Sequence, residues 1–439
     1  MVRTIFFVSA LLISGGIVAL AYFTKQPNWY YLFVFFGPLI LLGLRDAFQS
    51  KHAIKKNFPV IGNLRYFLES ISPEIQQYFV ERRTDGAPID KNQRAVIYQR
   101  SKNIGSTHPF GTEENVYAEG YEFVTHSLYP VHVHEEPRVT IGGEKCTQPY
   151  SASLYNISAM SFGSLSKNAV MALNRGAKKG KFYHNTGEGG ISPYHLEGGD
   201  LCWQLGTGYF GCRNDDGTFS QEKFRENSNR PEVKMIEVKL SQGAKPGHGG
   251  VLPGKKNTPE IAKIRGVVAG TTVLSPPSHS AFSDPKGLLD FCDELRELSG
   301  GKPIGFKMCI GKPREFEEIC EAMVASGQAP DFISIDGAEG GTGAAPLEFA
   351  NHMGIPLFVG LVMADRLLKK HGVRDKVKII ASGKIFSGFE MIKAISLGAD
   401  LCQTARSMML SIGCIHAQLC NTNTCPVGVA TQNKSLMKG

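Results

Sequence analysis

Residues 303–336 read PIGFKMCIGKPREFEEICEAMVASGQAPDFISID, and their pattern decides the fold class. The apolar run PIGFKMCI comes first, residues 314–326 follow with the apolar spacing of a helix, and the run DFISID closes the stretch. Two short β-rich runs joined by an amphipathic helix are typical of a βαβ unit with parallel strands. This stretch therefore predicts an α/β protein.

The same alternation continues on both sides of this stretch. Strands are predicted at NISAM (156–160), KFYHN (181–185), VKMIEVKL (233–240), PIGFKMCI (303–310), DFISID (331–336), PLFVG (356–360), VKIIAS (377–382) and DLCQT (400–404). Helices are predicted at 167–179, 285–298, 314–326 and 389–397. Eight such units in about 250 residues are the size of a TIM (β/α)8 barrel. A doubly wound sheet is the alternative, but no GxGxxG motif follows a first strand.

Composition and charge exclude several functional classes. The 439 residues are 42% hydrophobic, which is enough for one large core with an appendage. The net charge of +8 is spread along the chain without a long basic run, so we expect no nucleic-acid partner. Ten cysteines without paired spacing indicate a reducing compartment and no disulfide framework.

Two apolar runs open the chain, at residues 4–23 and 29–44. Each is long enough to cross a bilayer, and no small-residue cleavage site follows the first, so we expect a transmembrane hairpin over residues 1–45. Basic residues follow the second run at Arg45, Lys51, Lys55 and Lys56, whereas the connecting turn holds only Lys25. The positive-inside rule then places the large domain in the cytoplasm. A buried helical pair docked on a soluble domain is the alternative.

Residues 46–150 carry no catalytic constellation that we can identify, and we expect them to form a lead-in that wraps the barrel. The spacing predicts a helix over residues 69–83 and short strands at 96–99 and 121–128.

Six loops rich in glycine, serine or proline follow or end β-rich segments. They are SAMSFGS (158–164), NTGEGG (185–190), KLSQGAKPGHGG (239–250), SPPSHS (275–280), DGAEGGTGAAP (336–346) and ASGKIFSG (381–388). In a parallel barrel the strand ends meet at one mouth, where glycines allow the backbone to approach a ligand closely. Six loops on one face predict a site for a large planar cofactor and its phosphate.

The last unusual stretch is CIHAQLCNTNTCPVGVATQ (414–432), which places Cys414, Cys420 and Cys425 within twelve residues. Thiolates are soft ligands that suit iron-sulfur clusters and zinc. Spacing alone leaves three alternatives open: an iron-sulfur cluster, a Cys3His zinc site that uses His416, and three inert buried cysteines.

The spacing Cys-x5-Cys-x4-Cys followed by PVGVATQ resembles the 3Fe-4S cluster loop of the glutamate synthases, and the barrel-mouth loops match the flavin domain of that family in the same order. The resemblance covers about two thirds of the chain. It implies a TIM barrel that binds FMN beside a 3Fe-4S cluster held by the three cysteines. We therefore expect the FMN barrel over residues 151–412 and the cluster loop and tail over 413–439.

The resemblance also assigns the cofactor residues. The FMN phosphate is expected at the last two strand ends, against Ser382, Gly383, Lys384, Gln403, Thr404 and Arg406. Met160 and Ser161 are expected behind the isoalloxazine ring, and Lys307 beside its N1 and O2 edge, where a cation stabilises the anionic reduced flavin. A surface lysine is the alternative for Lys307, although the run GFKMCI is otherwise apolar.

If the substrate is 2-oxoglutarate, two carboxylates must be neutralised. The loop KLSQGAK offers Lys239, Gln242 and Lys245 for this role. Glu188 is the acid among the glycines of NTGEGG, and we expect it to handle the ammonium or iminium proton. A loop-anchoring or helix-capping acid is the alternative for Glu188.

By this resemblance the chain converts 2-oxoglutarate to L-glutamate through 2-iminoglutarate. Electrons would enter from ferredoxin or an NADPH-dependent subunit through the cluster to FMN, and a hydride would pass from flavin N5 to C2 of the imine. The chain begins Met-Val-Arg, without the N-terminal cysteine nucleophile of the family's amidotransferase domain, so we expect ammonia from solution or from a glutaminase partner.

Three departures from the family's pattern concern the substrate more than the cofactors. GAKPGEGG is here GAKPGHGG with His248, ISGHDGGTGASP is here ISIDGAEGGTGAAP, and FGFGT is here LCQTA. The alternatives are therefore a related flavin dehydrogenase of a modified amino acid, such as N-methylglutamate, and a membrane electron-transfer flavoprotein without glutamate chemistry.

Overall fold

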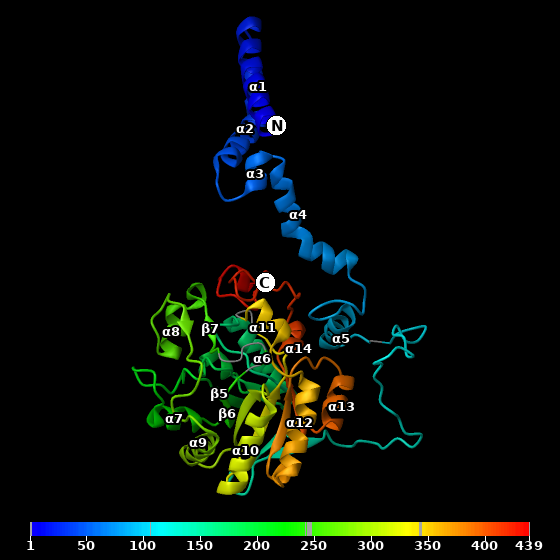
Figure 1. Cartoon of the computed structure of the whole chain (residues 1–439), viewed down its shortest axis with the longest axis vertical. Coiled ribbons are helices and arrows are strands. Elements are labelled where there is room, and N and C mark those ends of the chain that lie inside the picture. Colours follow the sequence, from blue (N-terminus) through cyan, green and yellow to red (C-terminus); the bar gives the residue numbers. More distant parts are fainter. Residues whose placement is uncertain (1, 106, 242, 244–247, 342–344, 439) are drawn as a thin grey trace. The chain divides into compact units, whose positions relative to one another are not determined.

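The computed structural model describes residues 2–105, 107–241, 243, 248–341 and 345–438. The chain divides into two compact units, Met1–Lys91 and Asn92–Gly439 (Figure 1). Each unit is described separately.

The first unit is helical. Its elements are α1 (Val2–Thr24), η1 (Pro27–Tyr31), α2 (Leu32–Phe48), α3 (Ala53–Asn57), α4 (Gly62–Ile75) and the π-helical turn η2 (Gln76–Val80). Two segments, Val2–Thr24 and Pro27–Phe48, have mean hydropathies of 2.3 and 1.6. By length and composition both could cross a membrane, a property that buried core helices and signal sequences share. In the last turn of α2, the buried Asp46 carboxylate accepts hydrogen bonds from the Val60 amide and the Asn63 side chain, which fixes the turn into α4.

The second unit is built on a closed barrel of parallel strands, as the sequence predicts. Within the described residues the barrel strands are β3 (Tyr155–Ile157), β4 (His184–Asn185), β5 (Leu201–Leu205), β6 (Val233–Lys239), β9 (Ile304–Cys309), β10 (Phe332–Asp336), β11 (Lys378–Ser382) and β12 (Leu401–Thr404). They follow one another around the barrel in chain order, and β12 closes on β3 through pairs such as Gln403 with Asn156. The fold is therefore a TIM-type barrel.

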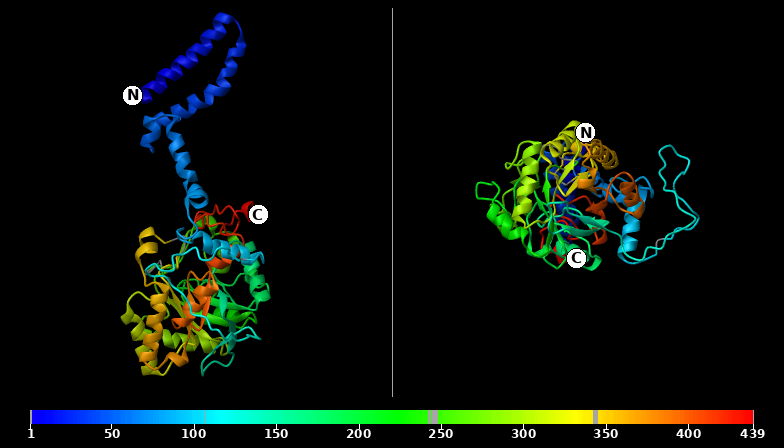
Figure 2. Two further views of the ribbon diagram at one scale, coloured as in Figure 1. Left: turned by 90° about the vertical axis from the view of Figure 1, so that its right-hand side faces the viewer. Right: turned by 90° about the horizontal axis from the view of Figure 1, so that it is seen from below.

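Helices surround these strands (Figures 1 and 2). They include α6 (Lys167–Gly180), α7 (Gln221–Ser228), α9 (Pro285–Leu298), α10 (Pro313–Ser326), α12 (Leu357–Lys370), α13 (Gly388–Ser396) and α14 (Arg406–Ser411). The start of α9 is set by its local sequence. The Asp284 side chain caps the helix by accepting a hydrogen bond from the Gly287 amide, and Pro285 occupies the first turn. Apolar side chains of β9 and α10, among them Phe306 and Phe316, share the main core between barrel and helices.

Smaller elements complete the unit. The antiparallel pair β1 (Arg138–Ile141) and β2 (Tyr150–Ser153) precedes the barrel. The connection after β6 carries β7 (Val251–Leu252), η4 (Gly254–Lys256), α8 (Pro259–Arg265) and β8 (Val273–Leu274). The remaining pieces are α5 (Lys91–Ser101), η3 (Pro193–His195), α11 (Leu347–His352), η5 (Arg374–Lys376) and η6 (Leu436–Lys438).

Seven of the predicted barrel strands are present, and one is wrong. PLFVG (356–360) begins helix α12, whose Leu357, Leu361, Ala364 and Leu368 are buried at helical spacing. The missing strand is β5, the run LCWQL, in which all five residues are buried. A short apolar run reads alike for a buried strand and for a buried helical turn, so periodicity could not separate the two.

The lead-in also differs from its prediction. Residues 96–99 lie in helix α5, where Arg94 and Ile97 are buried, and not in a strand. Residues 121–128, all described, form no strand. The helix predicted at 69–83 begins earlier, as α4, and continues into η2 only to Val80.

Buried histidines give this fold a predictable pH dependence. Burial lowers the pKa of His184 on β4 well below its ordinary value, helped by the neighbouring His195, and burial lowers the pKa of His195 to about 4. Within the described chain neither ring nitrogen of His184 has a hydrogen-bond partner. His184 is therefore neutral in the folded protein, whereas the same side chain in the unfolded chain binds a proton below about pH 6.5.

Because the unfolded state then binds more protons, the free energy of unfolding falls as the pH falls below about 6.5. From pH 6.5 to 5 this loss is about 2 kcal/mol for one such group, at about 1.4 kcal/mol per pH unit. We expect His184→Leu to remove His184's share of that slope in urea titrations at several pH values. An unchanged slope would show that His184 does not carry it.

Candidate active site

The carboxyl ends of the barrel strands bring several predicted residues together. Lys239 ends β6 and lies in register with Lys307 on β9, which in turn lies in register with Ser334 on β10. Asp336 at the end of β10 pairs in register with Ser382 on β11. Because parallel strands end at the same mouth of a barrel, the side chains of Lys239, Lys307, Asp336 and Ser382 share one site.

Glu188 and Lys239 form an ion pair at this mouth. Lys239 Nζ lies 3.2 Å from Glu188 Oε1, and the two side chains are 12% and 18% exposed. Two glycines flank the carboxylate closely: a Cβ on Gly250 would lie 2.0 Å from Glu188 Oε1, and one on Gly206 would lie 2.6 Å from Oε2. The glycines thus leave room for the Glu188 carboxylate, which follows β4 and pairs with Lys239 at the end of β6, two strands along the barrel.

The other two predicted carboxylate-binding residues, Gln242 and Lys245, lie outside the described residues. Gly243 between them is described, and its amide donates to Asp336 Oδ2 at 3.4 Å. A Cβ at Gly243 would lie 1.8 Å from the Gly337 carbonyl oxygen. The loop after β6 therefore passes directly over the loop after β10.

Lys307 is a buried lysine at the same mouth. Its side chain is 8% exposed, and its Nζ lies 3.6 Å from Asp336 Oδ2. The alternative of a surface lysine is excluded by this burial. A buried ammonium with one loosely placed carboxylate can give its charge to a ligand bound beside it.

A second group of cations lies at the ends of β11 and β12. Burial lowers the pKa of Lys384, and the nearby Arg406 guanidinium lowers it further. Arg406 donates to the backbone carbonyls of Glu339 and Gly341, at 3.1 and 3.0 Å. Two neighbouring cations that repel each other favour an anion between them, as the phosphate of a cofactor would be.

The remaining predicted phosphate residues divide into two sets. Thr404 Oγ1 donates to the Gly383 carbonyl, and Ser382 Oγ lies 3.3 Å from Ser158 Oγ, so these residues line the strand ends. The Gln403 amide instead lies inside the barrel, where it accepts from the Tyr183 hydroxyl and donates to Ser334 Oγ. Among the described contacts Gln403 belongs to a buried polar network, which places its side chain away from the phosphate end.

Met160 and Ser161 follow β3. Met160 is 5% exposed, and its amide donates to the Asn185 carbonyl. Ser161 Oγ meets Ser164 Oγ at 2.9 Å and accepts a long hydrogen bond of 3.4 Å from Arg265. Burial lowers the pKa of Arg265 to about 10, and the Glu188 carboxylate opposes that shift.

Arg265 is therefore a site residue that the sequence analysis missed. It comes from α8, some 100 residues beyond the loop that it contacts. The run IAKIRG that contains it looks like an ordinary helix end. Only its burial in the folded protein, where the residue is 5% exposed, marks it as a site residue.

The three cysteines lie together beyond β12. Burial raises the pKa of the Cys414 thiol to about 11, with the backbone amide of His416 opposing and Cys420 and Cys425 adding to the rise. Helix α5 lies against this loop: the Tyr98 hydroxyl donates to the Cys414 carbonyl at 2.7 Å. All ten cysteines are free thiols, so these three are available as ligands.

Among the described residues, the cysteine loop does not hold the compact group of donor atoms that a single zinc ion needs. A tetrahedral zinc ion, with Zn–S distances of about 2.3 Å, gathers its ligand atoms within about 4 Å of one another. Within the described chain these three sulfur atoms do not form such a group within 4.8 Å. His416, the fourth ligand of the zinc alternative, instead turns Nδ1 toward Arg94 Nη1 at 3.3 Å. Three separated soft ligands suit a centre with several metal ions.

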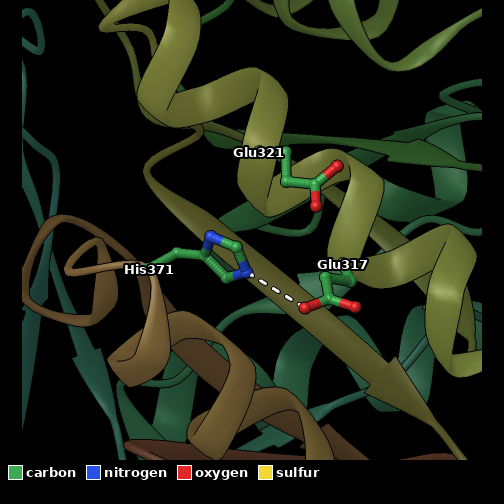
Figure 3. A group of neighbouring side chains, drawn as sticks. All are labelled: Glu317, Glu321 and His371. Carbon is green, nitrogen blue, oxygen red and sulfur yellow. Dashed lines mark hydrogen bonds and ion pairs between the residues drawn. The ribbon is translucent and has the colours of Figure 1, made fainter.

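Glu317, Glu321 and His371 are the three potential metal ligands that do lie within 4.8 Å of one another in the described chain. Figure 3 shows the His371 ring directed at Glu317, with Glu321 one turn along α10. Lys370 pairs with Glu317 at 2.5 Å, and Arg314 holds both oxygens of Glu321 at 2.9 Å. These cations already neutralise the carboxylates, so the cluster is explained as a surface ion-pair network.

Sequence comparisons relate this chain to the glutamate synthases. The family model described as the conserved region in glutamate synthase matches residues 112–439. The glutamate synthase large subunit-like protein YerD of Bacillus subtilis is 38% identical over 91% of this chain and 85% of its own length. The archaeal-type glutamate synthase [NADPH] of Thermotoga neapolitana is 36% identical over 64% of this chain, and this chain spans 52% of that relative's length.

Among solved structures, a mandelate oxidase with (S)-2-phenylpropionate superposes with a TM-score of 0.38 and 14% identity, covering 65% of this chain and 75% of the other. A flavocytochrome b2 variant with benzoylformate gives a TM-score of 0.39 and 15% identity, covering 64% of each chain.

Proposed function

The chain belongs to the glutamate synthase family, and we propose that it is an oxidoreductase that forms L-glutamate from 2-oxoglutarate and ammonia through 2-iminoglutarate. The observation that supports this proposal most directly is the Glu188–Lys239 pair at the barrel mouth, beside Lys307 on the next strand. The pair offers a cation for a substrate carboxylate and a carboxylate for an ammonium or iminium proton. Two opposite charges in one slot match 2-iminoglutarate, which carries carboxylates together with an iminium group.

We propose FMN and a 3Fe-4S cluster as the cofactors. When bound, FMN would supply the hydride to C2 of the imine, and the cluster would supply electrons one at a time. Ser382, Gly383, Lys384, Thr404 and Arg406 would hold the phosphate. We do not assign Gln403 to the phosphate, because its side-chain amide already forms hydrogen bonds with Tyr183 and Ser334 inside the barrel.

The other roles follow from the side chains at the mouth. Met160 and Ser161 would support the ring, and the Lys307 ammonium would hold its reduced form as an anion. Lys239, with Gln242 and Lys245 from the same loop, would bind the carboxylates of 2-oxoglutarate. Cys414, Cys420 and Cys425 would be the cluster ligands, so that residues 151–412 form the FMN barrel and 413–439 the cluster segment.

The electron donor and the ammonia source are part of the same proposal. Relatives are named for NADPH and, in Pyropia yezoensis, for ferredoxin, so we propose a donor of one of these two kinds. The chain spans about half the length of the archaeal-type relative. We propose that ammonia comes from solution or from a glutaminase partner.

Anaerobic spectroscopy of the purified full chain tests the cofactors, and a turnover assay tests the substrate. We expect a flavin spectrum together with the paramagnetic signal of an oxidised three-iron cluster. With ammonium and a low-potential reductant supplied, 2-oxoglutarate should yield glutamate. Cofactors without glutamate formation would overturn the substrate proposal, and flavin reduction by another amino acid would favour the modified amino acid instead.

We also propose that residues 1–45 anchor the protein as a hairpin in the membrane, with the barrel in the cytoplasm. Support comes from the two long apolar segments and from the basic residues after the second of them. Deleting residues 1–45 should release the protein from membranes in a flotation assay and keep its flavin, since the barrel is a separate compact unit. Aggregated protein without flavin would contradict this prediction and favour a hairpin docked on the barrel.

A further inference from the structure

Lys256 is a buried lysine that the proposed reaction does not use. It ends η4 in the connection after β6, it is 2% exposed, and it is among the largest fully buried side chains of the chain. Within the described residues it forms no ion pair with an acidic side chain. An ammonium in that position loses its hydration, which costs several kcal/mol unless other groups replace the water.

Three backbone carbonyls surround the Lys256 ammonium. Nζ donates to the carbonyl of Ser164, to that of Cys420 at 3.1 Å and to that of Ala430 at 3.2 Å. The first belongs to the loop after β3, and the other two belong to the cysteine loop and the segment behind it. One side chain therefore joins the predicted flavin side of the site to the predicted cluster side.

Carbonyl dipoles satisfy the hydrogen bonds of Lys256 but not its charge. The loop that it contacts at Cys420 would supply the balancing negative charge if its cysteines were ligands, since a coordinating thiol is deprotonated. The Lys256 ammonium reaches the backbone of Cys420 itself, since its Nζ lies 3.1 Å from the Cys420 carbonyl oxygen. The positive charge of Lys256 and the negative charges of the cysteine thiolates would therefore compensate each other.

We propose that Lys256 is the buried counter-ion of the cysteine-bound cluster and a positioning residue that raises the cluster's reduction potential. This inference rests on the proposed function, because it requires the three-cysteine cluster. Three thiolates bring three negative charges, and reduction adds one more, so a fixed positive charge nearby favours the reduced cluster. The hydrogen bond to Cys420 also holds the backbone of the middle ligand in place.

Lys256→Gln and Lys256→Met in the full chain test the proposal, with Lys255→Met as the matched control. Glutamine keeps an amide donor for the carbonyls but removes the charge, and methionine removes both. Lys255 is the preceding residue and is exposed, so its substitution removes the same charge from solvent. The readouts are iron and FMN content and the midpoint of a redox titration followed by the cluster's paramagnetic signal.

We expect Lys256→Gln to shift the oxidised-to-reduced equilibrium about tenfold to a hundredfold toward the oxidised cluster. That corresponds to a midpoint about 60 to 120 mV more negative, at 59 mV per decade for one electron. Lys256→Met should shift the midpoint in the same direction and lose part of its iron, while Lys255→Met should match the wild type.

An iron-containing Lys256→Gln protein with an unchanged midpoint would overturn this inference alone. Loss of iron and FMN together in both Lys256 variants would assign the lysine to the fold and would also overturn it. Wild-type protein that contains FMN but no iron would instead refute the cluster itself, so the two failures can be told apart.

Discussion

Cys420→Ser is expected to abolish the paramagnetic iron signal while FMN stays bound. Serine offers a hard hydroxyl in place of a soft thiolate, and a three-cysteine site has no spare ligand to replace it. The cations proposed to bind the phosphate lie at the ends of β11 and β12. They are separate from the three cysteines, so losing one thiol leaves the phosphate site unchanged. Iron analysis, flavin absorbance and the paramagnetic signal of the same preparation measure the two cofactors separately.

Cys146→Ser is the matched control for this experiment. Cys146 is half-buried outside the cysteine loop, and its thiol donates to the Gly301 carbonyl at 3.2 Å, as a serine hydroxyl also can. We expect the control to keep both cofactors. Full iron in Cys420→Ser would refute the ligand assignment, and loss of both cofactors would show that the two sites depend on each other.

The fold was predictable where burial leaves a distinct pattern on the sequence. The unit PIGFKMCI, helix and DFISID appears as β9, α10 and β10, because an amphipathic helix between two buried strands has few alternatives. PLFVG, predicted as a strand, begins α12, whereas LCWQL, for which no element was predicted, forms β5. Both are short apolar runs, and their tertiary position decides which becomes strand β5 and which becomes the start of α12.

The candidate site was predictable to the extent that strand ends identify it. Lys239 and Lys307 lie on two consecutive predicted strands, VKMIEVKL and PIGFKMCI. Parallel pairing of these strands places the two lysines next to each other. Contacts made across the chain do not follow: Lys256 reaches the cysteine loop, and Arg265 reaches the loop after β3. The side-chain direction of Gln403, into the barrel, depends on which face of β12 it occupies.

The second large effect is expected for Lys239→Ala. Charge-assisted hydrogen bonds to a carboxylate are worth roughly 1.5 to 3 kcal/mol, so the 2-oxoglutarate concentration needed for turnover should rise about tenfold to a hundredfold. Flavin content should not change, because Lys239 is far from the proposed phosphate residues in the order of strands around the barrel. Lys234→Ala is the control, since Lys234 lies on the same strand at its other end.

The structure adds a complication, because Lys239 also neutralises Glu188. Lys239→Ala therefore leaves an acid without this partner in the slot that the substrate must enter, and repulsion adds to the lost attraction. Glu188→Gln separates these contributions: it frees Lys239 for the substrate carboxylate, so KM for 2-oxoglutarate should stay equal or fall. Its kcat should fall instead, since no carboxylate then stabilises the iminium charge. Equal increases in KM for both variants would contradict this division of roles. Only Lys239 is proposed to bind the substrate carboxylate, so only its loss should raise KM.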